Sequence, residues 1–176
     1  MAALLCVVVV IVIATLVGFS VFVENVRAES TRSNLQQLAM ALELYQDEYR
    51  TFPAGGKTSV ESLWLLYPKL LADSRVYFNP RDRTRVPKDE GSLDRELTGF
   101  DYVGDCRTEF PKDIQVFERA ATSGGRYVLR VDGTIQWMDE SEFQRAVQEQ
   151  AENRVKAPAL PAFEVRPLTP ERKEAP

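Results

Sequence analysis

The sequence offers few side chains that could carry out chemistry. It contains no histidine and two cysteines, Cys6 and Cys106. Without histidine, a Ser-His-Asp or Cys-His catalytic arrangement is impossible, and the common zinc sites lose a usual ligand. Carboxylate pairs such as Asp89-Glu90 are flanked by polar residues, and adjacent side chains do not face each other on a helix or strand. The pattern therefore indicates a protein that is not an enzyme, with no catalytic residues.

The remaining candidate ligands do not form a recognisable set either. Asp101, Asp105 and Asp113 are too scattered for a calcium site, which needs roughly six to eight oxygen ligands. Cys6 lies in an apolar segment and Cys106 in a polar one, so we expect no intrachain disulfide. The net charge of −4, with both signs interspersed, shows no basic patch for nucleic acid. We therefore expect no metal, no cofactor, no small-molecule substrate and no nucleic-acid partner.

The N-terminal segment is uncharged and strongly apolar over residues 2–23. About 22 residues at 1.5 Å per residue suffice to cross the ~30 Å hydrocarbon core of a bilayer. A secretory signal peptide more often begins with basic residues and has an apolar stretch of only ~7–15 residues. The segment is therefore predicted to be a transmembrane anchor.

The same helix is expected to continue beyond the anchor. No proline or loop signal interrupts residues 3–49, and the first proline is Pro53. One apolar stripe follows the spacing of a helix that packs on a domain; it consists of Leu35, Leu38, Leu42, Tyr45 and Tyr49. The surface of this helix should change from apolar all round to apolar on one side near Glu24.

The rest of the chain has the pattern of a small sheet. Thr58 and Glu61 form a capping box that predicts a short helix, and residues 75–97 are expected to form an irregular surface loop. Short β-branched or aromatic segments predict four strands, at 99–104, 114–120, 126–131 and 134–138. Asp132-Gly133 is expected to form a two-residue type I′ hairpin turn.

The C-terminal part contains a predicted helix and a tail. The helix is expected over 139–149, and five prolines among residues 158–176 predict a disordered or extended tail. The chain divides into a transmembrane segment (2–23), a soluble domain (24–150) and a Pro-rich tail (151–176). The predicted fold class is α+β, with the long helix packed on a small antiparallel sheet.

The core of the soluble domain should lie between helix and sheet. Leu38, Leu42, Tyr45 and Tyr49 on the helix are expected to be buried. Their partners on the sheet should include Tyr127, Leu129, Ile135 and Trp137.

The chain resembles the type IV pilin-like proteins, and among them the major pseudopilins of type II secretion systems. In that family the helix commonly ends in a tyrosine, a few residues and an aromatic-proline pair, matched here by Tyr45, Tyr49, Phe52 and Pro53. Residues 126–143 are similar to a pilin-like C-terminal hairpin followed by an acidic helix. The resemblance covers roughly residues 2–145. It implies a non-catalytic subunit that assembles with other pilin-like subunits, through its helix, in a secretion or pilus-type machine.

One feature departs from the family. Its processing signal, a glycine followed by Phe-Thr-Leu-Ile-Glu, is not present, and no glutamate precedes Glu24. Two explanations remain open: the native start differs from the one given, or the protein does not polymerise by the usual route.

The resemblance also implies a location, and the residues of the anchor suggest an assembly surface. It places the chain in the inner membrane as a single-pass protein, with its domain on the periplasmic or extracellular side. Small residues at Ala14 and Gly18, spaced four apart, permit close helix packing in lipid. Arg27 and Arg32, by contrast, lie on the side that should be translocated.

An alternative is a single-span or secreted envelope protein whose domain binds a partner. Residues 26–28 (Val-Arg-Ala) satisfy the small-residue pattern for signal cleavage. Cleavage there would free the domain from its anchor.

Overall fold

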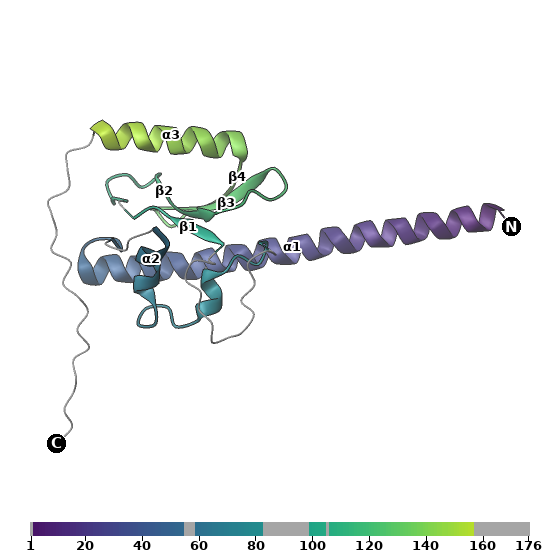
Figure 1. Ribbon diagram of the computed structural model, residues 1–176, viewed down its shortest axis with the longest axis horizontal. Helices are drawn as coiled ribbons and strands as arrows, with labels where there is room; N and C mark the ends of the chain where they lie inside the picture. The colour runs from purple at the N-terminus through teal and green to yellow at the C-terminus, as the bar shows by residue number, and fades with distance from the viewer. Residues whose placement is uncertain (1, 55–58, 83–98, 105, 157–176) are drawn as a thin grey trace, which may run out of the picture.

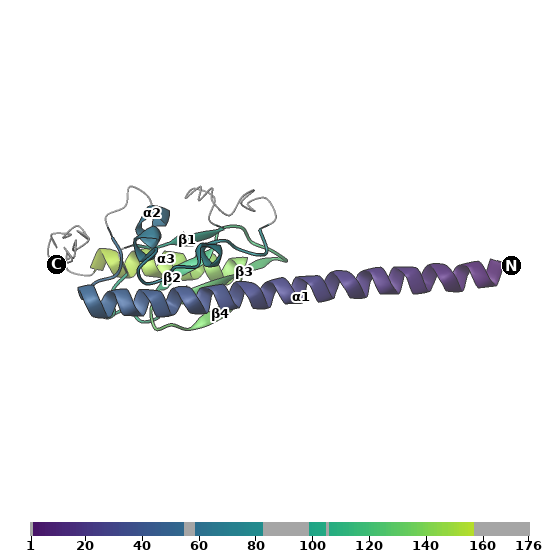
Figure 2. The ribbon, with the colours of Figure 1, turned by 90° about the horizontal axis from the view of Figure 1, so that it is seen from below.

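The computed structural model describes residues 2–54, 59–82, 99–104 and 106–156. Its longest element is the single helix α1 (Ala2–Tyr49), which extends well beyond the rest of the molecule at its N-terminal end (Figures 1 and 2). The predicted continuous helix is confirmed. The helix ends where Arg50 adopts a left-handed conformation (φ 60°) and its N–H donates to the Gln46 carbonyl at 2.7 Å. This is a common way to satisfy carbonyl groups at a helix C-terminus.

A four-stranded antiparallel sheet covers the C-terminal half of α1. Its strands are β1 (Phe100–Tyr102), β2 (Ile114–Glu118), β3 (Gly125–Arg130) and β4 (Ile135–Asp139), and they lie in sequence order across the sheet. The α+β fold class is confirmed. All four strands occur close to their predicted positions because each combines β-branched or aromatic residues with flanking turn residues.

Helix α3 (Glu140–Lys156) covers the opposite face of this sheet. The molecule therefore has three layers, α1, sheet and α3 (Figure 1). The helix is longer than the predicted 139–149 and extends into residues 151–156, which were expected to belong to the tail. The side chain of Gln150 explains part of this extension, because it pairs with both backbone groups of Ile114: it accepts from the N–H at 2.9 Å and donates to the carbonyl at 3.0 Å.

A hydrophobic core fills each of the two interfaces between the layers. The larger core lies between α1 and the sheet and includes Leu35, Leu38, Leu42, Leu129 and Val116. The smaller one lies under α3 and consists of Ile114, Val128, Met138 and Phe143. A register shift between Ile114 and Val116 lets one strand serve both cores. Such a bulge redirects the following side chains to the other face.

The turn between β3 and β4 differs from the prediction. Between β3 and β4, the Gly133 N–H donates to the Arg130 carbonyl at 3.0 Å, and Leu129 pairs with Ile135. This leaves a longer connection than two residues, and only Gly133 has a positive φ (79°). A type I′ turn needs a positive φ at both central residues. The predicted type I′ turn at Asp132-Gly133 is therefore wrong.

A turn of that kind lies instead between β2 and β3. Ser123 (φ 56°) and Gly124 (φ 83°) both have positive φ and connect Thr122 to Gly125. The Thr122 N–H donates to the Gly125 carbonyl at 2.7 Å. In the β3–β4 connection, by contrast, the pairing of the two strands decided the length of the loop, although an aspartate such as Asp132 tolerates a left-handed conformation better than most residues.

The segment between α1 and the sheet contains short helical turns. They are α2 (Ser59–Leu63), η1 (Trp64–Leu66) and η2 (Ser74–Tyr77). Thr58 of the predicted capping box lies outside the described residues, as do residues 157–176 of the predicted tail. The described part of the predicted surface loop is not a surface loop, because Val76, Tyr77, Asn79 and Arg81 are buried.

Candidate functional site at the junction of helix and domain

The surface of α1 changes character at Glu24. The side chains of residues 7–22 are all exposed, and partial burial begins at Val23 and Glu24. From Thr31 onward one face of the helix is buried. The N-terminal half contains a stretch long and apolar enough to cross a membrane, and none of that stretch is buried in the described part of the chain. The predicted change from an apolar surface all round to an apolar stripe is confirmed.

A buried ion pair lies at this junction. Arg81 Nη1 donates to Glu118 Oε2 at 3.0 Å, and the two side chains are 3% and 0% exposed. Asn79 Nδ2 donates to the other carboxylate oxygen at 2.9 Å, and the Tyr127 N–H donates to Oε2 at 2.7 Å. Both oxygens of the buried Glu118 therefore have donors, which a buried carboxylate requires.

The same cluster reaches the long helix at two points. Arg81 Nε donates to Glu24 Oε1 at 2.9 Å, and the Thr31 hydroxyl donates to Asn79 Oδ1 at 2.9 Å. Glu24 is the first charged residue after the apolar segment. We call the set Glu24, Thr31, Asn79, Arg81 and Glu118 the junction cluster. It connects the end of the apolar segment to the end of β2, one of the two inner strands of the sheet.

Aromatic rings complete the environment of Arg81. Its guanidinium carbon lies 4.8 Å from the centre of the Trp137 ring and 5.6 Å from that of Tyr127. Arginine commonly stacks on aromatic faces in this way. Trp137 was predicted to be buried, but 40% of it is exposed, so that prediction is wrong. It covers the guanidinium at the edge of the domain instead of filling the core.

Burial governs the electrostatics of the cluster. Desolvation raises the pKa of Glu118, although the Tyr127 N–H, Arg81 and Asn79 all favour its ionised form. At the same end of the sheet, just after β4, the pKa of Glu140 is lowered by hydrogen bonds from Gln144 and Arg126.

The predicted packing residues of the helix are placed as follows. Leu38, Leu42 and Tyr45 are buried in the larger core, and Tyr49 is half-buried against it, 4.4 Å from Tyr45 between ring centres. On the sheet, Leu129 is buried, whereas Tyr127 and Ile135 are half-buried. Ala14 and Gly18 lie on the exposed half of α1, and a Cβ on Gly18 would meet nothing within 4 Å. They are open to a neighbouring helix.

The aspartates considered for calcium have other partners. Asp101 pairs with Arg119 at 2.8 Å, and Asp113 lies 3.8 Å from Arg154. Asp105 lies outside the described residues. Among the residues that the structure describes, no three His, Cys, Asp or Glu side chains are grouped to hold a metal ion.

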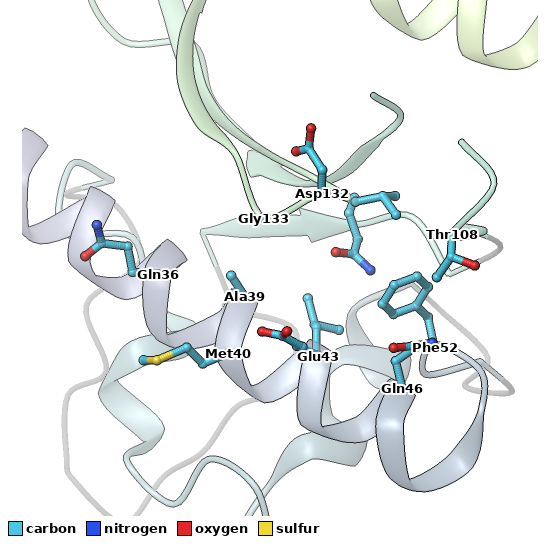
Figure 3. Close-up of a pocket in the computed structure, with 12 residues that line it drawn as sticks. Gln36, Ala39, Met40, Glu43, Gln46, Phe52, Thr108, Asp132 and Gly133 are labelled. Carbon is cyan, nitrogen blue, oxygen red and sulfur yellow. The ribbon is translucent and has the colours of Figure 1, made fainter. Parts of the chain in front are cut away.

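A groove of about 620 Å³ separates α1 from the β3–β4 connection. Gln36, Ala39, Met40, Glu43 and Gln46 of α1 line one side (Figure 3). Asp132 and Gly133 lie on the other side, and Thr108 and Phe52 lie at one end. The sequence did not suggest this groove because it depends on the position of the sheet relative to the helix.

The junction cluster was also missed, although one signal pointed to it. Glu118 comes two residues after Val116, so the alternation of a strand places a charge on the face that packs against α1. A charged residue on a buried face needs a partner. Arg81 could not be identified as that partner, because it lies 37 positions away in a segment without regular pattern.

A comparison of the chain with known protein families finds no match, and neither do comparisons with curated proteins and with solved structures. The architecture, a long N-terminal apolar helix packed on a small antiparallel sheet, is pilin-like.

Proposed function

We propose that the protein is a non-catalytic pilin-like or pseudopilin-like subunit that assembles through α1 in a secretion or pilus-type machine. One observation carries the proposal: a single helix has an apolar half with exposed side chains and a second half packed in the domain. Its partners are other pilin-like subunits and membrane lipid. We place the chain in the inner membrane as a single-pass protein, with its domain on the periplasmic or extracellular side.

The junction cluster supports this proposal. Glu24 and Thr31 of α1 bond to Arg81 and Asn79, so the domain is held to the helix next to the apolar segment. The orientation of the domain relative to the helix is thereby determined. A subunit that packs through its helix needs such a connection, because helix packing then positions every domain along an assembly.

The alternative, a secreted domain released by cleavage after Ala28, gains less support. Residues 26–28 lie within α1, and cleavage there would remove Glu24 and with it an acceptor for Arg81. A single-span envelope protein that acts alone remains the second candidate, and the groove beside α1 favours a binding role for its domain.

The test replaces residues 2–23 by a polyleucine span of equal length. We expect the variant to insert into the membrane but to lose co-isolation with pilin-like partners, because leucines fill the small-residue positions. Ala14→Leu/Gly18→Leu is the more limited variant and should have the same effect. Unchanged co-isolation or function with the polyleucine span would reduce the segment to a plain anchor and favour the single-span protein.

A further inference from the structure

Trp137 is an exposed aromatic residue that lies beside the junction cluster. It is 40% exposed, whereas every other aromatic side chain in the described residues after Phe22 is buried or half-buried. The ring lies against Gly125, where a Cβ would come within 2.7 Å of it, and Tyr127 meets it edge to face at 5.2 Å between ring centres. An indole that is held in place on one side and open on the other is typical of a contact surface.

The domain reaches α1 at the point where the apolar segment ends. Val23 and Glu24 are already half-buried, and Glu24 accepts from Arg81 Nε at 2.9 Å. The guanidinium carbon of Arg81 lies 4.8 Å from the centre of the Trp137 ring. The guanidinium thus joins the exposed indole to the first charged residue after the apolar segment.

The length of the apolar segment sets the depth of Glu24 in a bilayer. Residues 2–23 form about 33 Å of helix at 1.5 Å per residue, close to the ~30 Å hydrocarbon core. Glu24 therefore lies at the edge of that core when the segment spans it. The headgroup region extends roughly 5–8 Å further. Because the domain already contacts α1 at Glu24, its nearest part lies in the headgroup region.

The connection between β2 and β3 lies at the same end of the domain. The Thr122 carbonyl accepts from Arg81 Nη2 at 3.3 Å, and the connection reaches further toward the apolar half of α1 than α3 does (Figures 1 and 2). Residues 120–124, Ala-Ala-Thr-Ser-Gly, carry no charge, and all except Thr122 are exposed. A segment without charges can enter the headgroup region without the desolvation of an ion.

Charges near this surface are paired within the domain. Arg81 bonds to Glu24 and Glu118, and Arg126 Nη2 lies 2.6 Å from Glu140 Oε2. Helix α3 begins with acidic residues, but it starts further from the apolar half of α1 (Figure 1). No charge of one sign dominates this end of the domain, which fits a layer of zwitterionic headgroups.

We propose that Trp137 and the β2–β3 connection contact the phospholipid headgroups of the bilayer that α1 spans. The indole ring lies among the headgroups, where tryptophan is enriched in membrane proteins, and its N–H donates to lipid oxygens or water. Residues 120–124 rest on the same layer. The domain is thereby seated on the membrane surface, in an orientation that the junction cluster determines. This inference rests on the proposed membrane span of α1, but not on assembly with other subunits.

The test measures quenching of tryptophan fluorescence in the full chain, reconstituted in phosphatidylcholine vesicles. One set of vesicles contains phosphatidylcholine with a nitroxide on its headgroup, and a second set contains phosphatidylcholine with a nitroxide on its acyl chain. The chain has two tryptophans, and Trp64 is 4% exposed, so it serves as an internal reference. Trp137→Phe removes the reporter and leaves an aromatic ring in its place.

We expect the headgroup nitroxide to quench the unmutated protein several-fold more strongly than Trp137→Phe, because only Trp137 lies near the headgroups. Adding Ala121→Trp to Trp137→Phe should restore the quenching. Lys112→Trp in the same background is the matched control and should not restore it. Both positions are exposed and flank β2, but Lys112 precedes the strand, at the end of the sheet away from the junction cluster. Equal quenching at positions 112 and 121 would overturn the proposal, since the domain would then have no fixed side toward the bilayer.

A further variant separates failure of this inference from failure of the membrane span. Phe22→Trp, again combined with Trp137→Phe, places an indole in the apolar segment, where the acyl-chain nitroxide should quench it. Quenching at position 22 without quenching of Trp137 would overturn this inference and leave the span in place, because the domain would then stand clear of the bilayer or a second copy would cover Trp137. Quenching at neither position would refute the span and this inference together.

Discussion

At the scale of single residues, Arg81 connects more parts of the molecule than any other side chain of the junction cluster. It bonds to Glu24 on α1, to Glu118 on β2 and to the Thr122 carbonyl, while Trp137 covers it. A planar guanidinium with five donors can make all these contacts at once, whereas a lysine cannot.

Replacing Arg81 should therefore be costly. Arg81→Met leaves the fully buried Glu118 without its cation, which we expect to lower the free energy of unfolding by about 3–5 kcal/mol. Thermal or chemical denaturation of the full chain in detergent measures this. Arg75→Ala is the control, since Arg75 pairs with Asp73 on the surface and its side chain is 79% exposed; it should change little. A small effect of Arg81→Met would mean that the cluster does not stabilise the domain.

Glu118 should make stability depend on pH. Its pKa is raised in the folded state, so the folded chain keeps this proton to higher pH than the unfolded chain does. The contribution of Glu118 to the free energy of unfolding is then fully present at a pH below its pKa in the unfolded chain. It is lost as the pH rises through its pKa in the folded chain. We expect Glu118→Gln to remove this loss, as measured by unfolding at a series of pH values.

Glu140→Gln provides a control of opposite sign. The pKa of Glu140 is lowered, so its contribution is present above the unfolded pKa and is lost as the pH falls through the folded value. The difference in the free energy of unfolding between the unmutated protein and each variant should therefore change with pH in opposite directions for Glu118→Gln and Glu140→Gln. A change in the same direction would contradict the assignment of burial as the dominant cause at Glu118.

At the scale of elements, the C-terminal half of α1 is held to the sheet by a continuous apolar stripe. Leu38 and Leu42 are 0% and 1% exposed, whereas Met40 and Leu44 on the other side are more than half exposed. The helix is thus packed on one side only, and its other side is available along the domain.

This asymmetry gives a matched pair of leucine variants. Leu42→Ala should cost about 2–5 kcal/mol because it opens a cavity between helix and sheet. Leu44→Ala removes the same atoms from an exposed position and should have a much smaller effect. Denaturation of both variants under identical conditions checks this, and similar losses would mean that the proposed core is misassigned.

At the scale of the whole molecule, the N-terminal half of α1 projects as an apolar rod from the domain in which its C-terminal half is packed (Figure 2). The exposed half of α1 contains ten or more large apolar side chains, among them Ile11, Leu16, Phe19 and Phe22. An exposed apolar surface of this extent marks a contact with lipid or protein.

The anchor should remain attached in the cell. We expect the chain to stay with membranes after alkaline carbonate extraction, because an uncleaved apolar span of this length inserts stably. Mass spectrometry of the membrane fraction should find peptides from residues 2–23. A protein recovered only in soluble form and beginning at Glu29 would instead indicate cleavage after Ala28.

The sequence by itself determined the features that depend on local pattern. An unbroken apolar run, then a stripe with helical spacing, predicted α1 and the change of its surface near Glu24. Alternating β-branched and aromatic residues predicted the four strands. These patterns are readable because hydrophobic periodicity follows directly from the geometry of each element.

Only the tertiary structure decided the features that depend on contacts distant in sequence. Arg81 meets Glu118 and Glu24 across the fold, and α3 covers the second face of the sheet. The pairing of β3 with β4 determined the turn at Gly133, and the bulge in β2 placed Val116 and Glu118 toward α1. Partners of buried charges, strand register and the space between layers arise from packing, and no local pattern in the chain specifies them.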